Sequence, residues 1–198
     1  MIDARTIWIF SAIILLSSGC ATDVQERSNQ VAPSVQTGPF QSAADRAAFA
    51  LKKADRAAEQ EDAEALRASL HMLERLAVRP EGVSEEEMLA AWQARAPRDS
   101  PPLRGSAFGP AFRRGLLKPG GQMQIAQTFL AGQRAHLAIE IRNGGPFRVD
   151  VMDSEEKSVC SRIGKRARCT WLPLFTERHS IRLANRSERD LTYFLVIE

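Results

Sequence analysis

The spacing of apolar residues changes once along the 198-residue chain, and this change limits the folds available to it. Between residues 42 and 78 apolar residues recur every three to four positions, without glycine or proline, as in amphipathic helices. From Met123 onward they alternate with polar residues, as in half-buried strands. The stretch 96–106, APRDSPPLRGS, separates the two patterns and is typical of a linker. The sequence therefore predicts an α+β chain, with a helical unit followed by an antiparallel β-sandwich.

The first part is expected to form a helical hairpin or three-helix unit. Two helices are predicted over 42–60 and 62–78, with a corner at Glu61-Asp62; one unbroken helix is the alternative. A third helix is expected to open at Ser84, where Ser84 and Glu87 have the spacing of an S-x-x-E capping box. The glutamates of this first turn suit the positive end of a helix, so capping explains them better than a metal site.

The second part is predicted to contain short strands joined by tight turns. Asn143-Gly144-Gly145 is a strong turn signal, because glycine adopts positive φ angles without strain. Short alternating strands with frequent turns and no helical spacing favour an antiparallel β-sandwich. The last strand is apolar on both faces. Either the helices cover its outer face, which is the favoured interpretation, or that face is an apolar patch that binds a partner. The alternating apolar positions are Met123, Ile125, Phe129, Leu137, Ile139, Ile141, Phe147, Val149, Val151, Ile181, Leu183, Tyr193, Leu195 and Ile197.

An apolar run, IWIFSAIILLSSGC, precedes Cys20 and follows a short start that carries Arg5. Its order, a charged start, an apolar stretch and small residues, is typical of a secretion signal. Residues 16–20, LSSGC, resemble the lipobox of bacterial lipoproteins, which implies cleavage after residue 19 and lipidation of the Cys20 thiol. An uncleaved signal or membrane anchor is the alternative, although the run is shorter than a spanning helix needs. By resemblance to lipoprotein sorting, Ala21 favours the outer membrane, facing the periplasm.

Two further cysteines, Cys160 and Cys169, lie in the strand-rich part. In an oxidising periplasm they are expected to form a disulfide. The alternative, a redox pair or metal site, lacks the C-x-x-C spacing and nearby ligands. The predicted organisation is a signal peptide (1–19), a flexible tether (20–40), a helical unit (41–97), a linker (98–110) and a β-sandwich (111–198).

Several positions in the second part resemble the bacterial pre-peptidase C-terminal domain, a compact jelly-roll-like β-sandwich. They comprise an Ala-Gly turn after an early strand, a central strand running into an Asp-containing turn, and a closing Tyr-x-Leu strand. Glu177 and His179 depart from the family, which has glycine and tyrosine there. The resemblance implies a fold and a binding or accessory role, and it does not imply catalysis. The matching residues are Phe129–Gly132, Phe147–Asp153, Pro173, Thr176, Ile181, Leu183, Asn185, Tyr193 and Leu195.

Charge is distributed unevenly between the two parts. Residues 41–100 carry 9 basic and 12 acidic side chains, whereas residues 107–198 carry 15 and 9. Four cations inside the Cys160–Cys169 loop suggest a site for lipid phosphates, lipopolysaccharide or the acidic peptides of peptidoglycan. Solubility and pairing with the acidic helices are the simpler explanation. These candidate site residues are Arg162, Lys165, Arg166 and Arg168.

No pattern in the sequence predicts a catalytic site, a metal site or a cofactor. The three histidines are not paired at metal-binding spacing, and G-x-S-x-G and P-loop motifs are absent from the sequence. The acidic stretch 150–156 is expected to be a solvated turn, with calcium binding as the alternative. Nucleic acid is not an expected partner. The sequence thus predicts a non-catalytic, lipid-anchored protein of the envelope that acts as a binding or scaffold module. The alternative is an accessory subunit or inhibitor of an envelope or secreted enzyme. A hydrolase is the third possibility.

Overall fold

A computed structural model of the chain describes residues 42–96 and 109–198. The predictions for the signal peptide (1–19), Cys20, the tether (20–40) and most of the linker (98–110) therefore lie outside the described residues. Within the described ranges, no helix combines the length and the apolar character needed to cross a membrane.

Three helices form the first part of the described chain, as predicted: α1 (Ala43–Glu59), α2 (Ala63–Arg75) and α3 (Val83–Arg95), with one two-residue strand, Arg79–Pro80, between the last two. The first two are separate helices, because Glu61 has a positive φ of 56° and Asp62 caps α2 by accepting from the backbone of Ala65. A capping box between Ser42 and Asp45 opens α1.

The start of α3 differs from the prediction. Gly82 occupies the N-cap, and no side chain caps the helix, because Ser84 already lies within the first turn. The predicted capping box of Ser84 and Glu87 is therefore wrong. Instead the Ser84 hydroxyl donates to Oε2 of Glu85, and Oε1 of Glu85 accepts from the backbone N–H of Arg114 at 2.9 Å. Burial alone would raise the pKa of Glu85, but these hydrogen bonds outweigh it and lower that pKa.

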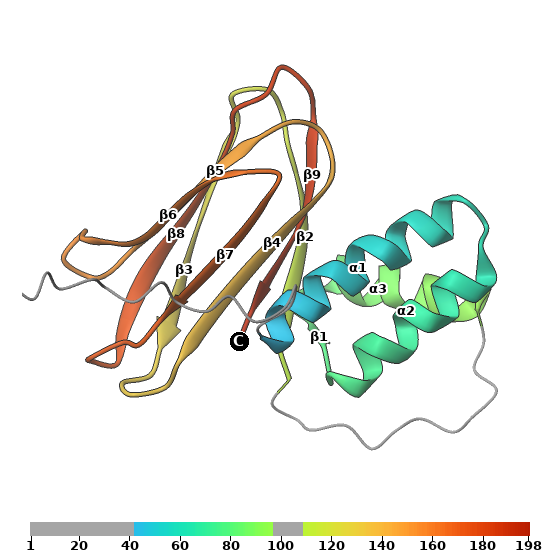
Figure 1. Ribbon diagram of the computed structural model, residues 1–198, viewed down its shortest axis with the longest axis horizontal. Coiled ribbons are helices and arrows are strands. Elements are labelled where there is room, and N and C mark those ends of the chain that lie inside the picture. The colour runs from blue at the N-terminus through green and yellow to red at the C-terminus, as the bar shows by residue number, and fades with distance from the viewer. Residues whose placement is uncertain (1–41, 97–108) are drawn as a thin grey trace, which may run out of the picture. The chain divides into compact units, whose positions relative to one another are not determined.

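The strands form two sheets that pack face to face as a β-sandwich (Figure 1). One sheet has the order β1-β2-β9-β4-β7, in which the short β1 pairs with β2 in parallel and the other pairs are antiparallel. The other has the order β3-β8-β5-β6 and is antiparallel throughout. The strands are β1 (Arg79–Pro80), β2 (Ala111–Leu117), β3 (Gln122–Phe129), β4 (Ala135–Asn143), β5 (Phe147–Met152), β6 (Ser158–Gly164), β7 (Arg166–Trp171), β8 (Glu177–Asn185) and β9 (Leu191–Ile197).

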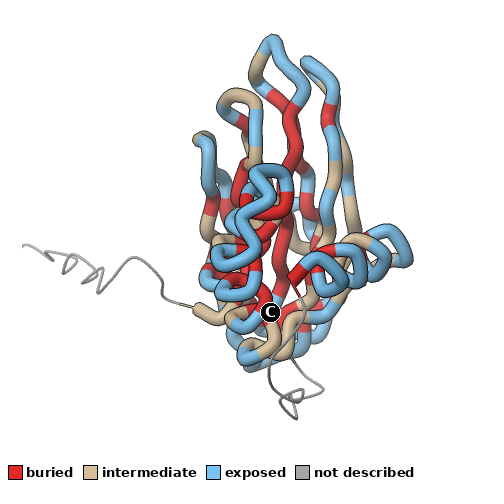
Figure 2. Tube along the Cα trace, turned by 90° about the vertical axis from the view of Figure 1, so that its right-hand side faces the viewer, coloured by how far each residue is buried: buried red, intermediate tan, exposed pale blue. Residues whose placement is uncertain are grey.

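The predicted alternation places its apolar side chains between the two sheets. Phe147, Val149 and Val151 of β5 are fully buried, while Arg148 and Asp150 between them point outward. Most of the buried residues of the strands (red in Figure 2) belong to this core between the sheets. His179 belongs to this core, packed edge-on against Phe129, with a centroid distance of 5.3 Å.

A second core lies between the helices and the outer face of the five-stranded sheet. Phe194 and Val196 of β9 and Phe112 of β2 are fully buried there. The prediction that the helices cover the last strand is therefore confirmed. The face that α1 turns toward the sheet consists mainly of small side chains, which let the helix approach closely. These residues are Ala44, Ala47, Ala48, Leu51, Ala54 and Ala58.

Ion pairs around this second core join the acidic helices to the basic strands. Nζ of Lys52 lies 2.9 Å from Oε2 of Glu140, a β4 residue whose side chain is 5% exposed. Asp55 pairs with Arg142 of β4, with 2.7 Å between Oδ2 and Nε. The opposite charges of the two parts thus meet at the interface between the helices and the sheet.

The Cys160–Cys169 disulfide is present and links the two sheets through their edge strands, β6 and β7. Both cysteines are buried in the core, 6.0 Å apart between Cα atoms. Replacing both by alanine is expected to lower the free energy of unfolding by about 2–3 kcal/mol, because the unfolded chain loses a short closed loop. Urea unfolding measures this loss. Wild-type protein in reducing agent should match the variant, and an unchanged midpoint on reduction would contradict the prediction.

Candidate functional site

The outer face of the four-stranded sheet is the candidate site, because no helix or strand of the described residues packs on it, whereas helices cover the five-stranded sheet (Figure 1). Its side chains alternate with buried core residues along each strand, so they point away from the core. We call this surface the open sheet face. It is formed by Gln122, Gln124, Ala126, Thr128, Arg148, Asp150, Met152, Val159, Ser161, Ile163, Arg178, Ser180, Arg182 and Ala184.

One polar row crosses all four strands of this face. The strand register places Gln124 beside Arg182, Arg182 beside Asp150, and Asp150 beside Ser161. Adjacent strands are about 4.8 Å apart, so the row extends about 14 Å. It offers an amide, a guanidinium, a carboxylate and a hydroxyl to solvent along a nearly straight line.

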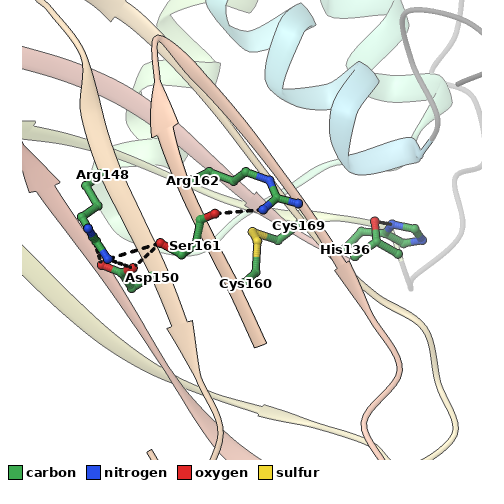
Figure 3. The surroundings of a disulfide bond; sticks show 8 residues. His136, Arg148, Asp150, Cys160, Ser161, Arg162 and Cys169 are labelled. Carbon is green, nitrogen blue, oxygen red and sulfur yellow. Dashed lines mark hydrogen bonds and ion pairs between the residues drawn. A yellow bond between two sulfur atoms is a disulfide. The ribbon is translucent and has the colours of Figure 1, made fainter. Parts of the chain in front are cut away.

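The carboxylate in this row is already occupied. Arg148 donates from Nε and Nη2 to the two oxygens of Asp150 at 2.7 and 2.9 Å, and the Ser161 hydroxyl donates to Oδ1 at 2.7 Å (Figure 3). The hydrogen bonds from Arg148 are the main reason why the pKa of Asp150 is lowered, and the charge of Arg182 contributes. Asp150 therefore stays ionised while its negative charge is neutralised by Arg148.

Replacing Asp150 by asparagine is expected to lower the free energy of unfolding at neutral pH. A carboxyl whose pKa falls on folding stabilises the folded protein fully at pH values above its pKa in the unfolded chain. This stabilisation is lost as the pH drops through its pKa in the folded protein. The ordinary pKa of an aspartate carboxyl is 3.8. The difference between wild type and variant should thus be constant above about pH 5 and shrink below pH 3.8. Urea unfolding at a series of pH values tests this; a difference that persists unchanged in strong acid would contradict it.

Two arginines leave the open sheet face with net positive charge. Arg182 extends from the middle of β8, and Arg178 lies at the start of the same strand; both are exposed. Among residues 42–96 and 109–198, no carboxylate lies within ion-pair distance of either guanidinium. The face thus presents unneutralised cations among amides and hydroxyls, which suits an anionic and polar partner.

The four basic residues predicted as a site divide into two groups. Arg166 and Arg168 of β7 turn toward the helices, where they lie 3.6 Å from Glu140 and 3.1 Å from Asp45. Arg162 and Lys165 are exposed, and Arg162 donates to the carbonyl of Ser161 at 2.8 Å (Figure 3). The disulfide loop therefore has two exposed cations, Arg162 in the edge strand β6 and Lys165 just after it. Of the other two, Arg168 pairs with Asp45 of α1 and Arg166 with Glu140 of β4.

Arg148 and Gln124 were not among the predicted site residues. The signal that could have found them is the alternation itself, because each polar position between the core residues of β3, β5 and β8 belongs to the same outer face. The sequence did not show which of the two sheets the helices leave open.

The acidic stretch 150–156 consists of the end of β5 and the turn after it, and the carboxylates of Asp150, Asp153 and Glu155 have partners within the chain. Oδ1 of Asp153 accepts from the backbone N–H groups of Glu155 and Lys157, both at 2.9 Å. The Lys157 ammonium pairs with Glu155. In the part of the chain that the structure describes, no group of three potential metal ligands comes together.

A pocket of about 270 Å³ opens at the corner between α1 and α2. Its titratable lining residues are Glu61, Asp62 and Arg95. Asp62 is used as the N-cap of α2, and Glu61 forms the left-handed turn before it. Both acids thus have local structural roles.

No family model matches this chain, and no curated protein matches it. Solved structures similar to part of it include the pre-peptidase C-terminal domain of collagenase from Bacillus anthracis, with 10% identity over 44% of this chain and 87% of that chain, at a TM-score of 0.40. PliG from Aeromonas hydrophila, a periplasmic inhibitor of g-type lysozyme, is 11% identical over 45% of this chain and 84% of PliG, with a TM-score of 0.37. The carbohydrate-binding module CBM36, solved with calcium and xylotriose, is 22% identical over 42% of this chain and 76% of the module, with a TM-score of 0.29. At these TM-scores the similarities carry no conclusion about what this chain binds.

Proposed function

We propose that this chain is a lipid-anchored protein of the bacterial envelope whose β-sandwich binds an anionic component of the cell wall without catalysing a reaction. The observation that carries the proposal is the open sheet face, where Arg182 lies in a polar row beside Gln124 and no carboxylate neutralises Arg178 among the described residues. The apolar run ending at Cys20 supports export and lipidation. A disulfide between Cys160 and Cys169 suits an oxidising compartment.

Peptidoglycan is the anionic component that this surface fits best. Its carboxylates are spaced along peptides, and its sugars and peptides carry hydroxyl and amide groups. The open sheet face is similarly mixed: it presents two separate cations among the amides of Gln122 and Gln124 and the hydroxyl of Thr128. A densely charged phosphate surface would instead favour a cluster of cations.

Sedimentation with purified peptidoglycan sacculi tests the proposal. The full-length lipidated protein in detergent is expected to sediment with the sacculi at low salt and to be released as the salt concentration rises, because exposed charges are screened. Arg182→Gln combined with Gln124→Ala should weaken binding by about three- to tenfold. Arg67→Gln on the exposed side of α2 is the matched control, since it removes one cation outside the open sheet face. Equal binding by the two variants would refute the role of this face.

A further inference from the structure

An exposed apolar cluster lies at one end of the sandwich, formed by the loops that join β3 to β4 and β7 to β8. We call it the apolar tip. It consists of Leu130, Leu172, Leu174 and Phe175, which are 50%, 54%, 79% and 72% exposed. Large apolar side chains gathered in solvent are unusual on a soluble protein and mark an interaction surface.

The two loops of the apolar tip are tied to each other. The backbone N–H of Gly132 donates to the carbonyl of Pro173 at 2.9 Å, and the N–H of Ala131 donates to the Thr176 hydroxyl at 3.0 Å. Gly132 has a positive φ of 70°, as this turn requires. The four apolar side chains are thus presented together by a preformed pair of loops.

Aromatic side chains fill the space beneath the apolar tip. The rings of Phe129 and Trp171 pack edge to face with centroids 4.7 Å apart, and the imidazole of His179 lies 5.6 Å from the ring of Trp171. Because the core is filled there, the tip residues have no buried position to turn into. Their exposure is therefore a property of the fold.

The apolar tip lies at the same end of the sandwich as the beginning of α1 (Figure 1). Trp171 pairs with Ala135 at the start of β4, and the next residue, His136, exchanges backbone hydrogen bonds with Glu198. Oε2 of Glu198 in turn accepts from the backbone N–H of Ala44 at 3.0 Å. The chain that leads back to Cys20 therefore leaves the folded part at the end that carries the tip.

The number of residues between Cys20 and Ser42 limits how far this end can lie from the lipid anchor. The two residues are 22 positions apart, and 22 residues span at most about 70–80 Å even when fully extended. Arg134, in the same loop as Leu130, and Arg178, just after the other loop, are both exposed. Apolar side chains flanked by arginines suit an anionic bilayer, where the guanidinium groups reach the phosphates.

We propose that the apolar tip inserts into the interfacial region of the anionic phospholipid bilayer to which Cys20 is anchored. This inference rests on the lipid anchor of the proposed function. It adds a second contact, which holds the sandwich upright with its loop end on the membrane and leaves the middle of the open sheet face, with Arg182 and Gln124, clear of the lipid.

Fluorescence quenching by brominated lipids tests the insertion. The full-length lipidated protein carrying Phe175→Trp is reconstituted into vesicles of phosphatidylethanolamine and phosphatidylglycerol with brominated acyl chains, and its signal is corrected for wild type. We expect at least about twofold quenching relative to the same vesicles without bromine. Glu188→Trp is the control, because Glu188 is exposed in the turn between β8 and β9, at the opposite end of the sandwich; it should not be quenched.

Flotation of the same vesicles separates the two ways in which the idea can fail. If the protein floats with the vesicles but residue 175 is not quenched, the apolar tip does not contact the membrane. The tip would then be a binding surface for a protein partner. Protein that does not float overturns the anchor and this inference with it. Leu174→Ser combined with Phe175→Ser should abolish protection of the tip loops from protease on vesicles, while flotation through Cys20 persists.

Discussion

Replacing Phe194 by alanine is expected to lower the free energy of unfolding by about 3–5 kcal/mol. The side chain is fully buried between β9 and the helices, and its ring centroid lies 6.5 Å from that of Trp92 in α3. Truncation would leave a cavity between two layers that ion pairs such as Lys52–Glu140 hold in place. Since Phe194 contacts both layers, we expect the helices and the sandwich to lose stability together.

Urea unfolding followed by two signals measures this effect. Far-UV circular dichroism at helical wavelengths and tryptophan fluorescence should report one transition, shifted to lower urea concentration by Phe194→Ala. Ile163→Ala is the control, because Ile163 is 65% exposed on the open sheet face and should change stability by no more than about 0.5 kcal/mol. If only the helical signal shifted, the helices would be an independently folding unit and the expectation would be wrong.

Replacing Lys52 by methionine should cost about 3 kcal/mol. Glu140 is almost fully buried beneath α1, and Lys52 is its near partner at 2.9 Å. Arg166, the remaining cation, is 3.6 Å away and largely exposed, so it compensates only in part. Loss of Lys52 therefore leaves a buried carboxylate without a close counterion.

A double-mutant cycle identifies the cause of this loss. Lys52→Met combined with Glu140→Met should recover most of the stability, because no buried charge then remains and the methionines fill the space. Lys53→Met is the matched control, because Lys53 is the neighbouring exposed lysine and its replacement should change the free energy of unfolding only slightly. A single variant at Lys52 that is as stable as the control would show that Glu140 is solvated in the folded protein.

Local patterns in the sequence were sufficient for most of the secondary structure. The alternation of Phe147, Val149 and Val151 predicted a strand with one buried face, and that face is buried. The two apolar faces of β9 predicted cover on both sides, which the opposite sheet and the helices provide. These predictions succeeded because a side chain's direction follows from backbone periodicity alone.

The start of α3 and the charged residues were harder to predict from sequence. The S-x-x-E spacing at Ser84 suggested capping, but Glu85 instead binds the backbone of β2, 29 residues away. Likewise Arg162 and Arg168 are near in sequence, yet one is exposed beside the disulfide and the other turns toward Asp45 of α1. Such contacts depend on which elements meet, and a local motif contains no information on that.

The sequence by itself determined that a helical part comes before a strand-rich part, which apolar residues of β3, β4, β5, β8 and β9 lie between the sheets, and which cysteines pair, because these follow from the periodicity of apolar residues and from residue type. Only the tertiary structure decided which sheet the helices cover, and therefore which arginines of the open sheet face have no carboxylate partner among residues 42–96 and 109–198. It also brought Leu130 together with Leu174 and Phe175, from loops that are far apart in sequence. The physical reason is that both surfaces are made by strand pairing and layer packing between distant segments, which no local pattern specifies.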